Sequence, residues 1–417
     1  MKARFRGAAA CAALIVVFHG SPASARPNAR WVATWTTSPT EATDSEELIH
    51  WNQANPQKEW SEASLLRGTL RYRLRIAKGG KQLRVSLANS YERAMLRIEG
   101  MSVGVAAKGF DADPATLKEV RFNRETGMTL PAGTRAISDP VDLPVKDGED
   151  LIVSIYVPDG IFLLTYPPQP HFSLVDVAAG ANQMMSGHMS GGQSLNSRTV
   201  LSEVDVLTTG CKGVVVAVGD SITDGNLYDG VRGWPGVLAH RLAPQGISVV
   251  DAGIGGNRVL TPQGPVERAL LARFDEDVLT IPGITDIILL EGINDIGGMG
   301  TTEPYGTLPP VTAAELIAAY RQVIAKAHLR NIRIIGATIL PFAGSFYYAP
   351  EKDVIRRAVN EWIRTSGEFD AVIDFDAALR DPAEPDRIRP NLTVDHLHPN
   401  GEGYRLMGEM IDPRLFQ

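Results

Sequence analysis

Cysteine is scarce in this chain of 417 residues, which contains two, Cys11 and Cys211. So few cysteines exclude the class of small domains in which several disulfide bridges replace a hydrophobic core. Stability must come from a packed core instead, and the apolar fraction of 44% is ordinary for that purpose. The chain also lacks a cysteine cluster and a His-Glu-x-x-His motif. We therefore expect no catalytic metal.

An excess of positive charge is absent as well, because 41 Lys and Arg stand against 48 Asp and Glu. This balance disfavours nucleic acid as a partner, since phosphates need basic side chains. The apolar run near the N-terminus, residues 8–18, is too short to span a bilayer as a helix. Basic residues precede it and an Ala-Ser-Ala site ending at Ala25 follows, which is typical of a secretory signal. We expect cleavage near Ala25, giving a secreted or periplasmic protein.

The N-terminal part of the chain has a β-type pattern from about Trp31 to Leu207. Apolar residues alternate with polar ones over 70–76, a turn with two glycines follows, and the alternation resumes over 83–87. This pattern predicts a hairpin with one buried face. We interpret residues 26–205 as a β-sandwich domain of jelly-roll type that precedes the rest of the chain.

The polar positions of the first of these strands are arginines, Arg71, Arg73 and Arg75. Three guanidinium groups on one face of a strand could hold an anionic sugar. A solvated outer face of the sandwich is the alternative, and we favour it because charged side chains usually face water.

From residue 206 onward, apolar strands alternate with amphipathic stretches. The strand candidates are 213–218, 247–251, 286–291, 333–340 and 371–375. The helix candidates are 231–243, 313–330, 351–366 and a final segment after His398. This alternation predicts an α/β domain over residues 206–417, with a doubly wound, mostly parallel five-stranded sheet covered by helices on both faces.

Gly219-Asp220-Ser221 follows the first strand candidate directly, so a serine hydroxyl is expected at the carboxyl edge of the sheet, where such folds bind ligands. A helix N-cap is the other role that serine often has at this position. As a nucleophile, serine needs a base whose tautomer is fixed by a third group. Asp395 and His398 could supply both from one short segment near the C-terminus.

Acyl transfer also requires donors for the negative charge that develops on the attacked carbonyl oxygen. Gly253, Gly255 and Gly256 follow the second strand candidate, and any of them could bring a backbone N–H close to a ligand. Asn294 follows the third strand candidate and offers a carboxamide N–H at the same edge.

These segments, in this order, resemble the four signature blocks of the SGNH hydrolases, also called the GDSL esterase/lipase family. The blocks match Ser221, Gly256, Asn294, and Asp395 with His398. One departure is Asp251, which opens the second block where many members have Asn. The resemblance covers residues 206–417 and implies a flavodoxin-like fold without a cofactor.

The resemblance also implies a role for each matched residue. Ser221 is expected to be the nucleophile, His398 the general base, and Asp395 the residue that orients the imidazole. The oxyanion hole is expected to consist of the backbone N–H groups of Ser221 and Gly256 with the side chain of Asn294.

Four longer segments, residues 219–225, 257–260, 290–297 and 360–367, resemble the two-domain bacterial branch of this family, whose members are assigned as acetylxylan esterases, arylesterases or acylhydrolases. The expected substrate is a small-molecule or polysaccharide ester with a short acyl group. Two alternatives remain: a lipase or lysophospholipase, and a carbohydrate-binding protein with a vestigial hydrolase half. Candidates for the wall of the substrate pocket are Trp234, Asn257, Arg258, Phe342, Tyr347 and Tyr348. The sequence predicts no particular oligomeric state.

Overall fold

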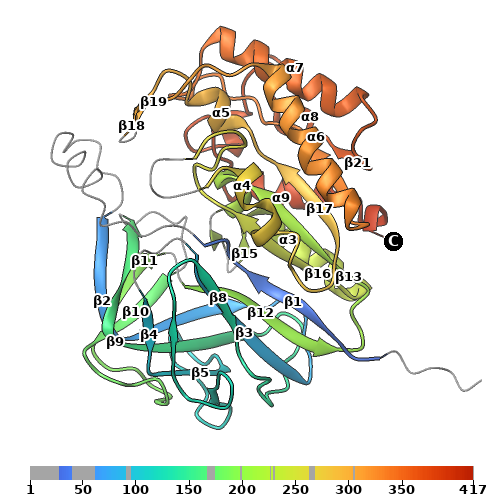
Figure 1. The fold of residues 1–417 in the computed structure, drawn as a ribbon. Coiled ribbons are helices and arrows are strands. Elements are labelled where there is room, and N and C mark those ends of the chain that lie inside the picture. The colour runs from blue at the N-terminus through green and yellow to red at the C-terminus, as the bar shows by residue number, and fades with distance from the viewer. Residues whose placement is uncertain are drawn as a thin grey trace, which may run out of the picture.

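The structure is a computed structural model of the chain. It describes residues 28–39, 62–90, 95–166, 174–197, 200–225, 227–228, 231–262, 268–303 and 306–416. The predicted signal sequence, residues 1–25, lies outside the described residues. The strands of the N-terminal part form one layered body, and a mixed body of strands and helices packs beside it (Figure 1). Among the described residues, no helix is both long and apolar enough to cross a membrane.

Two antiparallel sheets form the N-terminal body, which we call the sandwich region (residues 30–208). One has the strand order β1-β12-β3-β8 and the other β11-β10-β2-β9-β5-β6, while β4 pairs with β7. The strands are β1 (Arg30–Thr36), β2 (Glu62–Arg75), β3 (Gln82–Asn89), β4 (Leu96–Ile98), β5 (Gly100–Val105), β6 (Lys118–Val120), β7 (Met128–Leu130), β8 (Thr134–Ile137), β9 (Asp150–Tyr166), β10 (Leu174–Ala179), β11 (Gly192–Ser197) and β12 (Leu201–Thr208). The predicted β-sandwich is confirmed.

The predicted hairpin between residues 70–76 and 83–87 is wrong. Strand β2 pairs with β9 and β10 in one sheet, whereas β3 pairs with β12 and β8 in the other. The apolar residues of both strands, Leu70 and Val85 among them, are nevertheless buried. Alternation identifies the buried face of a strand but not its hydrogen-bonding partner, because two strands in facing sheets turn their apolar faces to the same core.

The arginine-rich face of β2 is not simply solvated, because Arg71 is completely buried. Its guanidinium donates to Ser154 Oγ at 2.9 Å, and to four backbone carbonyls in the segments around residues 110 and 183–187. Arg73 and Arg75 are partly exposed and pair with Asp150 at 2.7 and 2.6 Å. Each of the three guanidinium groups is therefore engaged by the protein itself.

The C-terminal body, which we call the α/β region (residues 213–416), contains a five-stranded sheet in which every pairing is parallel. Its strand order is β16-β13-β17-β20-β21, the 2-1-3-4-5 order of flavodoxin-like folds. The strands are β13 (Gly213–Gly219), β16 (Ile247–Gly253), β17 (Ile284–Leu290), β20 (Arg333–Ala337) and β21 (Ala371–Ile373). The five predicted strands and the doubly wound sheet are confirmed.

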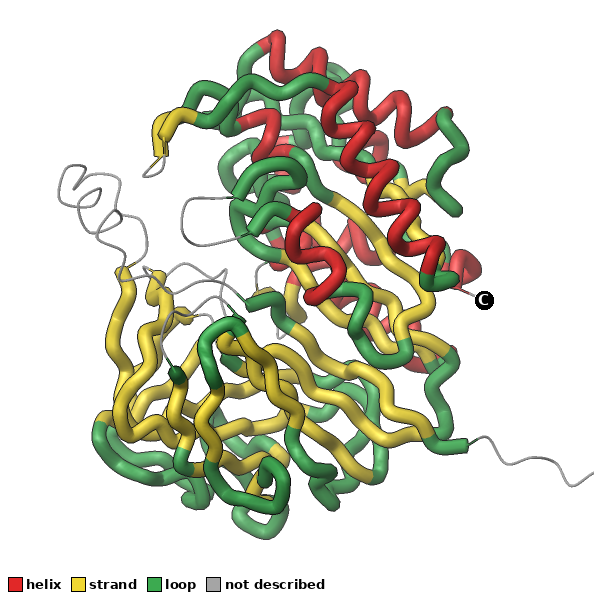
Figure 2. The backbone as a smooth tube through the Cα atoms, in the orientation of Figure 1, coloured by secondary structure: helices red, strands yellow, loops and turns green. Residues whose placement is uncertain are grey.

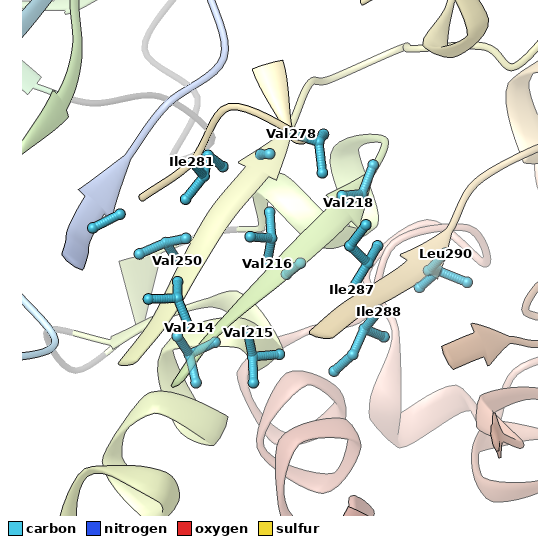
Figure 3. Close-up of a cluster of buried hydrophobic side chains, with 14 of the residues drawn as sticks. Val214, Val215, Val216, Val218, Val250, Val278, Ile281, Ile287, Ile288 and Leu290 are labelled. Carbon is cyan, nitrogen blue, oxygen red and sulfur yellow. The ribbon is translucent and has the colours of Figure 1, made fainter. Parts of the chain in front are cut away.

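Strand β13 lies inside the sheet between β16 and β17, and all seven of its residues are buried. Figure 3 shows Val214 and Val216 of β13 packed among Val250 of β16 and Ile287 of β17. A strand covered on both faces needs apolar residues at successive positions, which explains the unbroken apolar run in the sequence.

Helices cover both faces of this sheet (Figure 2). They are α2 (Ser221–Asp224), α3 (Gly233–Leu242), α4 (Leu270–Asp277), α5 (Ile293–Gly297), α6 (Ala313–Leu329), α7 (Pro350–Thr365), α8 (Phe375–Leu379) and α9 (Gly401–Met410). Short 3-10 helices are η1 (Ala243–Gln245), η2 (Pro390–Leu392) and η3 (Pro413–Phe416), and two small ribbons are formed by β14 (Leu227–Tyr228) with β15 (Val231–Arg232) and β18 (Thr302–Glu303) with β19 (Gly306–Thr307). Helices α3, α8 and α9 pack together, as do α4, α6 and α7. The sequence pattern did not predict α4.

The two regions share a packed interface along β1. Thr36 Oγ1 donates to the carbonyl of Asp251 at 2.6 Å, and Ser248 Oγ donates to the carbonyl of Ala33 at 2.8 Å. Arg135 of β8 forms an ion pair with Asp277 of α4. Strand β12 ends at Thr208, so the predicted boundary between residues 205 and 206 falls within this strand.

Candidate active site

Ser221 is the first residue of helix α2, directly beyond the carboxyl end of β13. The N-cap of this helix is Asp220, whose Oδ1 accepts from the backbone N–H of Ile222 at 2.9 Å. The hydroxyl of Ser221 is therefore not the cap, and the alternative role for this serine is excluded. Gly219 is required at the bend, because a Cβ there would lie 2.2 Å from the carbonyl oxygen of Leu290.

Ser221, His398 and Asp395 lie in one hydrogen-bonded row. Ser221 Oγ is 2.9 Å from His398 Nε2, and His398 Nδ1 is 2.7 Å from Asp395 Oδ2. An ionised carboxylate can only accept, so His398 carries its proton on Nδ1 and presents the lone pair of Nε2 to the serine. This is the geometry in which an imidazole can remove a hydroxyl proton.

The carboxylate of Asp395 is fixed from several sides. Its Oδ1 accepts from the backbone N–H groups of Leu397 at 3.0 Å and of His398 at 2.7 Å. Burial raises the pKa of Asp395, but the hydrogen bonds from the side chain and backbone of His398 outweigh that effect and hold the pKa below its ordinary value. Asp395 therefore stays ionised at neutral pH and can stabilise a charged imidazole.

Asn294 lies in the first turn of α5, beyond the carboxyl end of β17. Its Nδ2 donates to the carbonyl of Asn257 at 3.0 Å, and its Oδ1 accepts from the hydroxyl of Tyr347 at 3.1 Å. Burial raises the pKa of Tyr347 to about 12, so this hydroxyl remains a donor. These two bonds fix the orientation of the carboxamide, which has a second N–H on the same nitrogen.

Gly256 directly precedes Asn257, so its segment is joined to Asn294 through that hydrogen bond. Its φ of 79° lies in the left-handed region, which favours glycine. Asp295, which the sequence pattern did not single out, joins the same two segments. Its carboxylate accepts from the backbone N–H groups of Val259 and Leu260 at 2.8 and 2.9 Å. Burial raises the pKa of Asp295 to about 6.

Among the aromatic candidates for a pocket wall, two are fully buried. Trp234 packs on Phe375 with ring centroids 5.5 Å apart, and Phe342 packs on Tyr348 at the same distance. Neither Trp234 nor Phe342 offers surface to a substrate, because both aromatic rings are packed inside the hydrophobic core.

The remaining wall candidates differ in whether they contact Asn294. Arg258 is buried and its Nη2 lies 2.9 Å from each carboxylate oxygen of Glu303, while Tyr348 donates to Asp386. Asn257 and Tyr347 both contact Asn294 directly. A residue that sequence reasoning missed is Phe346, which is 75% exposed and lies 4.3 Å from the ring of Tyr347 between centroids. Its only signal is the aromatic run in which it stands.

The described residues contain no group of three or more His, Cys, Asp or Glu side chains placed to hold a metal ion. In this geometry a proton can pass between the Ser221 hydroxyl and the His398 imidazole. The carboxamide of Asn294 and the turn at Gly256 could bind the negative charge that develops on a carbonyl oxygen.

Comparison with family models gives one match: residues 217–406 match the GDSL-like Lipase/Acylhydrolase family. A search of curated proteins gave no match. Among solved structures, an acetylxylan esterase from Geobacillus stearothermophilus is 24% identical, covers 48% of this chain and 92% of its own, and has a TM-score of 0.37. A member of the lipolytic protein G-D-S-L family from Veillonella parvula DSM 2008 is 22% identical, covers 47% of this chain and 94% of its own, and has a TM-score of 0.36. A GDSL-like lipase from Bacteroides thetaiotaomicron VPI-5482 is 20% identical, covers 47% of this chain and 84% of its own, and has a TM-score of 0.34.

The family match spans β13 to α9 and so includes every segment described above, from Ser221 to His398. The α/β region of this chain belongs to the GDSL-like lipase/acylhydrolase family, the SGNH hydrolases, and the protein is a carboxylic ester hydrolase.

Proposed function

We propose that the protein is a serine esterase that removes short acyl groups, of the acetyl type, from carbohydrate. The observation that carries the proposal is the hydrogen-bonded row of Asp395, His398 and Ser221 at the carboxyl edge of the parallel sheet. The signal-like segment ending at Ala25 supports a secreted or periplasmic location, where a polymeric ester would be within reach.

The reaction proceeds in two steps through an acyl-enzyme. Ser221 Oγ attacks the ester carbonyl carbon while its proton passes to His398 Nε2, and the ester oxygen then leaves as an alcohol by taking that proton. Water attacks the acyl group in the same way, so that His398 returns the proton to Ser221 and a carboxylic acid is released. Asp395 holds the imidazole and stabilises its charged form without accepting the proton.

Negative charge collects on the carbonyl oxygen in both steps. The donors assigned to it are the backbone N–H groups of Ser221 and Gly256 and the side chain of Asn294. Donors that are fixed before the reaction stabilise this charge without reorganising, and the two bonds that hold the Asn294 carboxamide supply that condition.

The preference for carbohydrate is supported by the surroundings of Asn294 and by the two-region organisation. The exposed ring of Phe346 lies against Tyr347, whose hydroxyl contacts Asn294, so an aromatic surface adjoins the assigned oxyanion donor. Such a ring could carry the apolar face of a sugar. Residues 26–205 are assigned to substrate engagement and residues 206–417 to catalysis.

A second candidate is a lipase or lysophospholipase activity. A second exposed apolar side chain is that of Val394, which is 62% exposed and precedes Asp395 directly, and exposed apolar side chains could also bind a longer acyl chain. The third possibility, a vestigial hydrolase half in a carbohydrate-binding protein, is disfavoured by the intact row from Asp395 to Ser221.

Activity on p-nitrophenyl acetate, butyrate and octanoate, measured beside acetylated xylan and a lysophospholipid, tests the proposal. We expect the highest kcat/KM on the acetate, release of acetate from the xylan, and rates that EDTA does not change. A preference for octanoate together with release of fatty acid from the lysophospholipid would favour the lipase. Absence of hydrolysis of every ester by the folded protein would favour the vestigial alternative.

A further inference from the structure

Arg273 of α4 is a fully buried arginine that no role assigned so far uses. A buried guanidinium requires partners for its donors, because an unpaired charge in the interior is strongly unfavourable. The partners of Arg273 therefore show what it holds in place.

Besides Asp277 of its own helix, whose carboxylate lies 3.8 Å from Nη1, Arg273 contacts residues at or just beyond the carboxyl ends of β13, β16 and β17. Arg273 Nη2 donates to the carbonyl of Gly219 at 3.4 Å, two residues before Ser221. Its Nη1 donates to the carbonyl of Ala252 at 2.9 Å, at the end of β16. Its Nη2 also lies 4.0 Å from a carboxylate oxygen of Glu291, three residues before Asn294. One guanidinium thus joins the ends of β13, β16 and β17, each of which leads into an assigned oxyanion donor.

Asn257 connects Arg273 to Asn294 by two bonds in series. Arg273 Nε donates to Asn257 Oδ1 at 2.8 Å, and the backbone carbonyl of Asn257 accepts from Asn294 Nδ2 at 3.0 Å. The Asn257 side chain also donates to the carbonyl of Arg268 at 2.9 Å, which fixes its orientation. Movement of Arg273 would therefore be transmitted to the carboxamide of Asn294 and to the turn at Gly256.

The sandwich region completes this arrangement through Ser38. Arg273 Nη1 donates to Ser38 Oγ at 3.1 Å, and the same hydroxyl donates to the carbonyl of Ala252 at 3.3 Å. Ser38 follows β1, so a residue of the sandwich region accepts a hydrogen bond from the guanidinium of Arg273.

We propose that Arg273 is the positioning residue of the oxyanion hole, holding the donors from Ser221, Gly256 and Asn294 at one spacing. It touches neither substrate nor the reacting atoms and acts through Asn257 and the strand ends. The inference rests on the proposed function, because it presumes that these three groups bind the oxyanion. The planar fork of arginine suits this position, since several donors leave in fixed directions from one rigid group.

The test compares Arg273→Met and Arg273→Lys with Arg71→Met. Arg71 is equally buried but lies in the sandwich region, where its partners are unrelated to the strand ends that lead to Ser221. Each variant is purified as the full chain, its fold is checked by circular dichroism, and its active sites are counted by fluorophosphonate labelling. The rate on p-nitrophenyl acetate is then expressed per labelled site.

For Arg273→Met we expect kcat per labelled site to fall by about 10- to 100-fold with KM within about threefold of wild type, because oxyanion donors act on the transition state. The affinity for an alkyl boronic acid, which forms a tetrahedral adduct on the serine, should fall in parallel with kcat. Arg273→Lys should recover only part of the loss. Arg71→Met should lower the melting temperature and leave kcat per labelled site within about twofold of wild type.

A double-mutant cycle with Asn294→Ala separates positioning from general damage. If Arg273 works through Asn294, its substitution should cost much less in the Asn294→Ala background than in wild type. A kcat per labelled site in Arg273→Met that equals wild type, or a loss that is fully additive with Asn294→Ala, would overturn the inference. If neither Arg273 variant folds, Asn257→Ala decides by the same criteria, since it removes the acceptor for Arg273 Nε.

Failure of this inference is distinguishable from failure of the proposed function. Wild-type protein that fluorophosphonate does not label at Ser221 would contradict the nucleophile, whatever Arg273 does. Wild-type protein that is labelled, together with an unaffected Arg273→Met, would contradict the positioning role alone.

Discussion

Two of the fully buried arginines, Arg71 and Arg273, show how differently the two sheets use polar side chains. Arg71 projects from an antiparallel strand and bonds to Ser154 and to the loop segments that cover it. Arg273 instead contacts residues at the carboxyl ends of three different parallel strands. In a parallel sheet the carboxyl ends of the strands meet at one edge, so residues distant in sequence converge there. In the sandwich region Arg71 instead holds two loop segments, around residue 110 and at residues 183–187, and no strand end of the parallel sheet.

The largest effect is expected at the edge where the parallel strands end. There Ser221→Ala should lower the esterase activity by about 10⁴-fold or more. The thermal stability should stay close to that of wild type, because the hydroxyl is not the helix cap. A fluorophosphonate probe should label the wild type and not the variant. Labelling that survives the substitution would place the nucleophile elsewhere in the chain.

Asn294→Ala tests the contribution of the side chain that follows the neighbouring strand, β17. We expect kcat to fall by about 10²- to 10³-fold with little change in KM, since the carboxamide is assigned to the transition state. Tyr347→Phe, which removes the hydroxyl that orients Asn294, should cause a smaller loss of the same kind. A sharp rise in KM at unchanged kcat would show that Asn294 binds the substrate instead.

Arg135→Met sharpens the comparison at the boundary of the two regions. The variant leaves the buried carboxylate of Asp277 without this partner, and we expect the free energy of unfolding to fall by about 2–3 kcal/mol. Arg97→Met is the matched control, because Arg97 pairs with exposed carboxylates within the sandwich region. It should change stability by less than about 0.5 kcal/mol. Equal losses in urea unfolding would contradict a stabilising interface.

Asp220→Asn should have the smallest effect, which is a change in how the free energy of unfolding depends on pH. Burial raises the pKa of Asp220 to about 7, so the folded state holds a proton that the unfolded chain has already released. The stability contributed by this group is therefore present at low pH and is lost as pH rises through about 7. Asparagine does not titrate, so the variant should gain about 1–2 kcal/mol relative to wild type between pH 5 and pH 8.

Urea unfolding at the two pH values measures this difference. Asp159→Asn, at an exposed position, serves as the control and should change stability equally at both. A relative stability of Asp220→Asn that does not change with pH would contradict the buried proton.

The fold could be predicted from sequence wherever a local pattern decides the outcome. The unbroken apolar run of β13 indicated a strand buried on both faces, and alternation identified the buried positions of β2 and β3. Strand pairing could not be predicted, because β2 and β3 have the same alternation whether they share a sheet or face each other across a core. Helix α4 was missed although Leu270, Phe274 and Val278 recur every four residues, because the segment is short and charged.

The candidate site divides in the same way. The positions of Ser221 and Asn294 followed from motifs at strand ends and that of His398 from its spacing to Asp395, and the structure brings Ser221 and His398 within hydrogen-bonding distance. Arg273 and Tyr347 could not be connected to the site from sequence, since their contacts depend on tertiary packing rather than on spacing along the chain.

Because β1 pairs with β12, the first and the last strand of the sandwich region lie side by side. Arg30 lies opposite Thr208 in the register, and its guanidinium donates to the carbonyls of Cys211 and Lys212, where the chain passes into the α/β region. Entry and exit are thus adjacent, as in domains that can be inserted or exchanged as a unit. A replacement module would need matching ends at one location only, and a residue able to take the position of Ser38 behind Arg273.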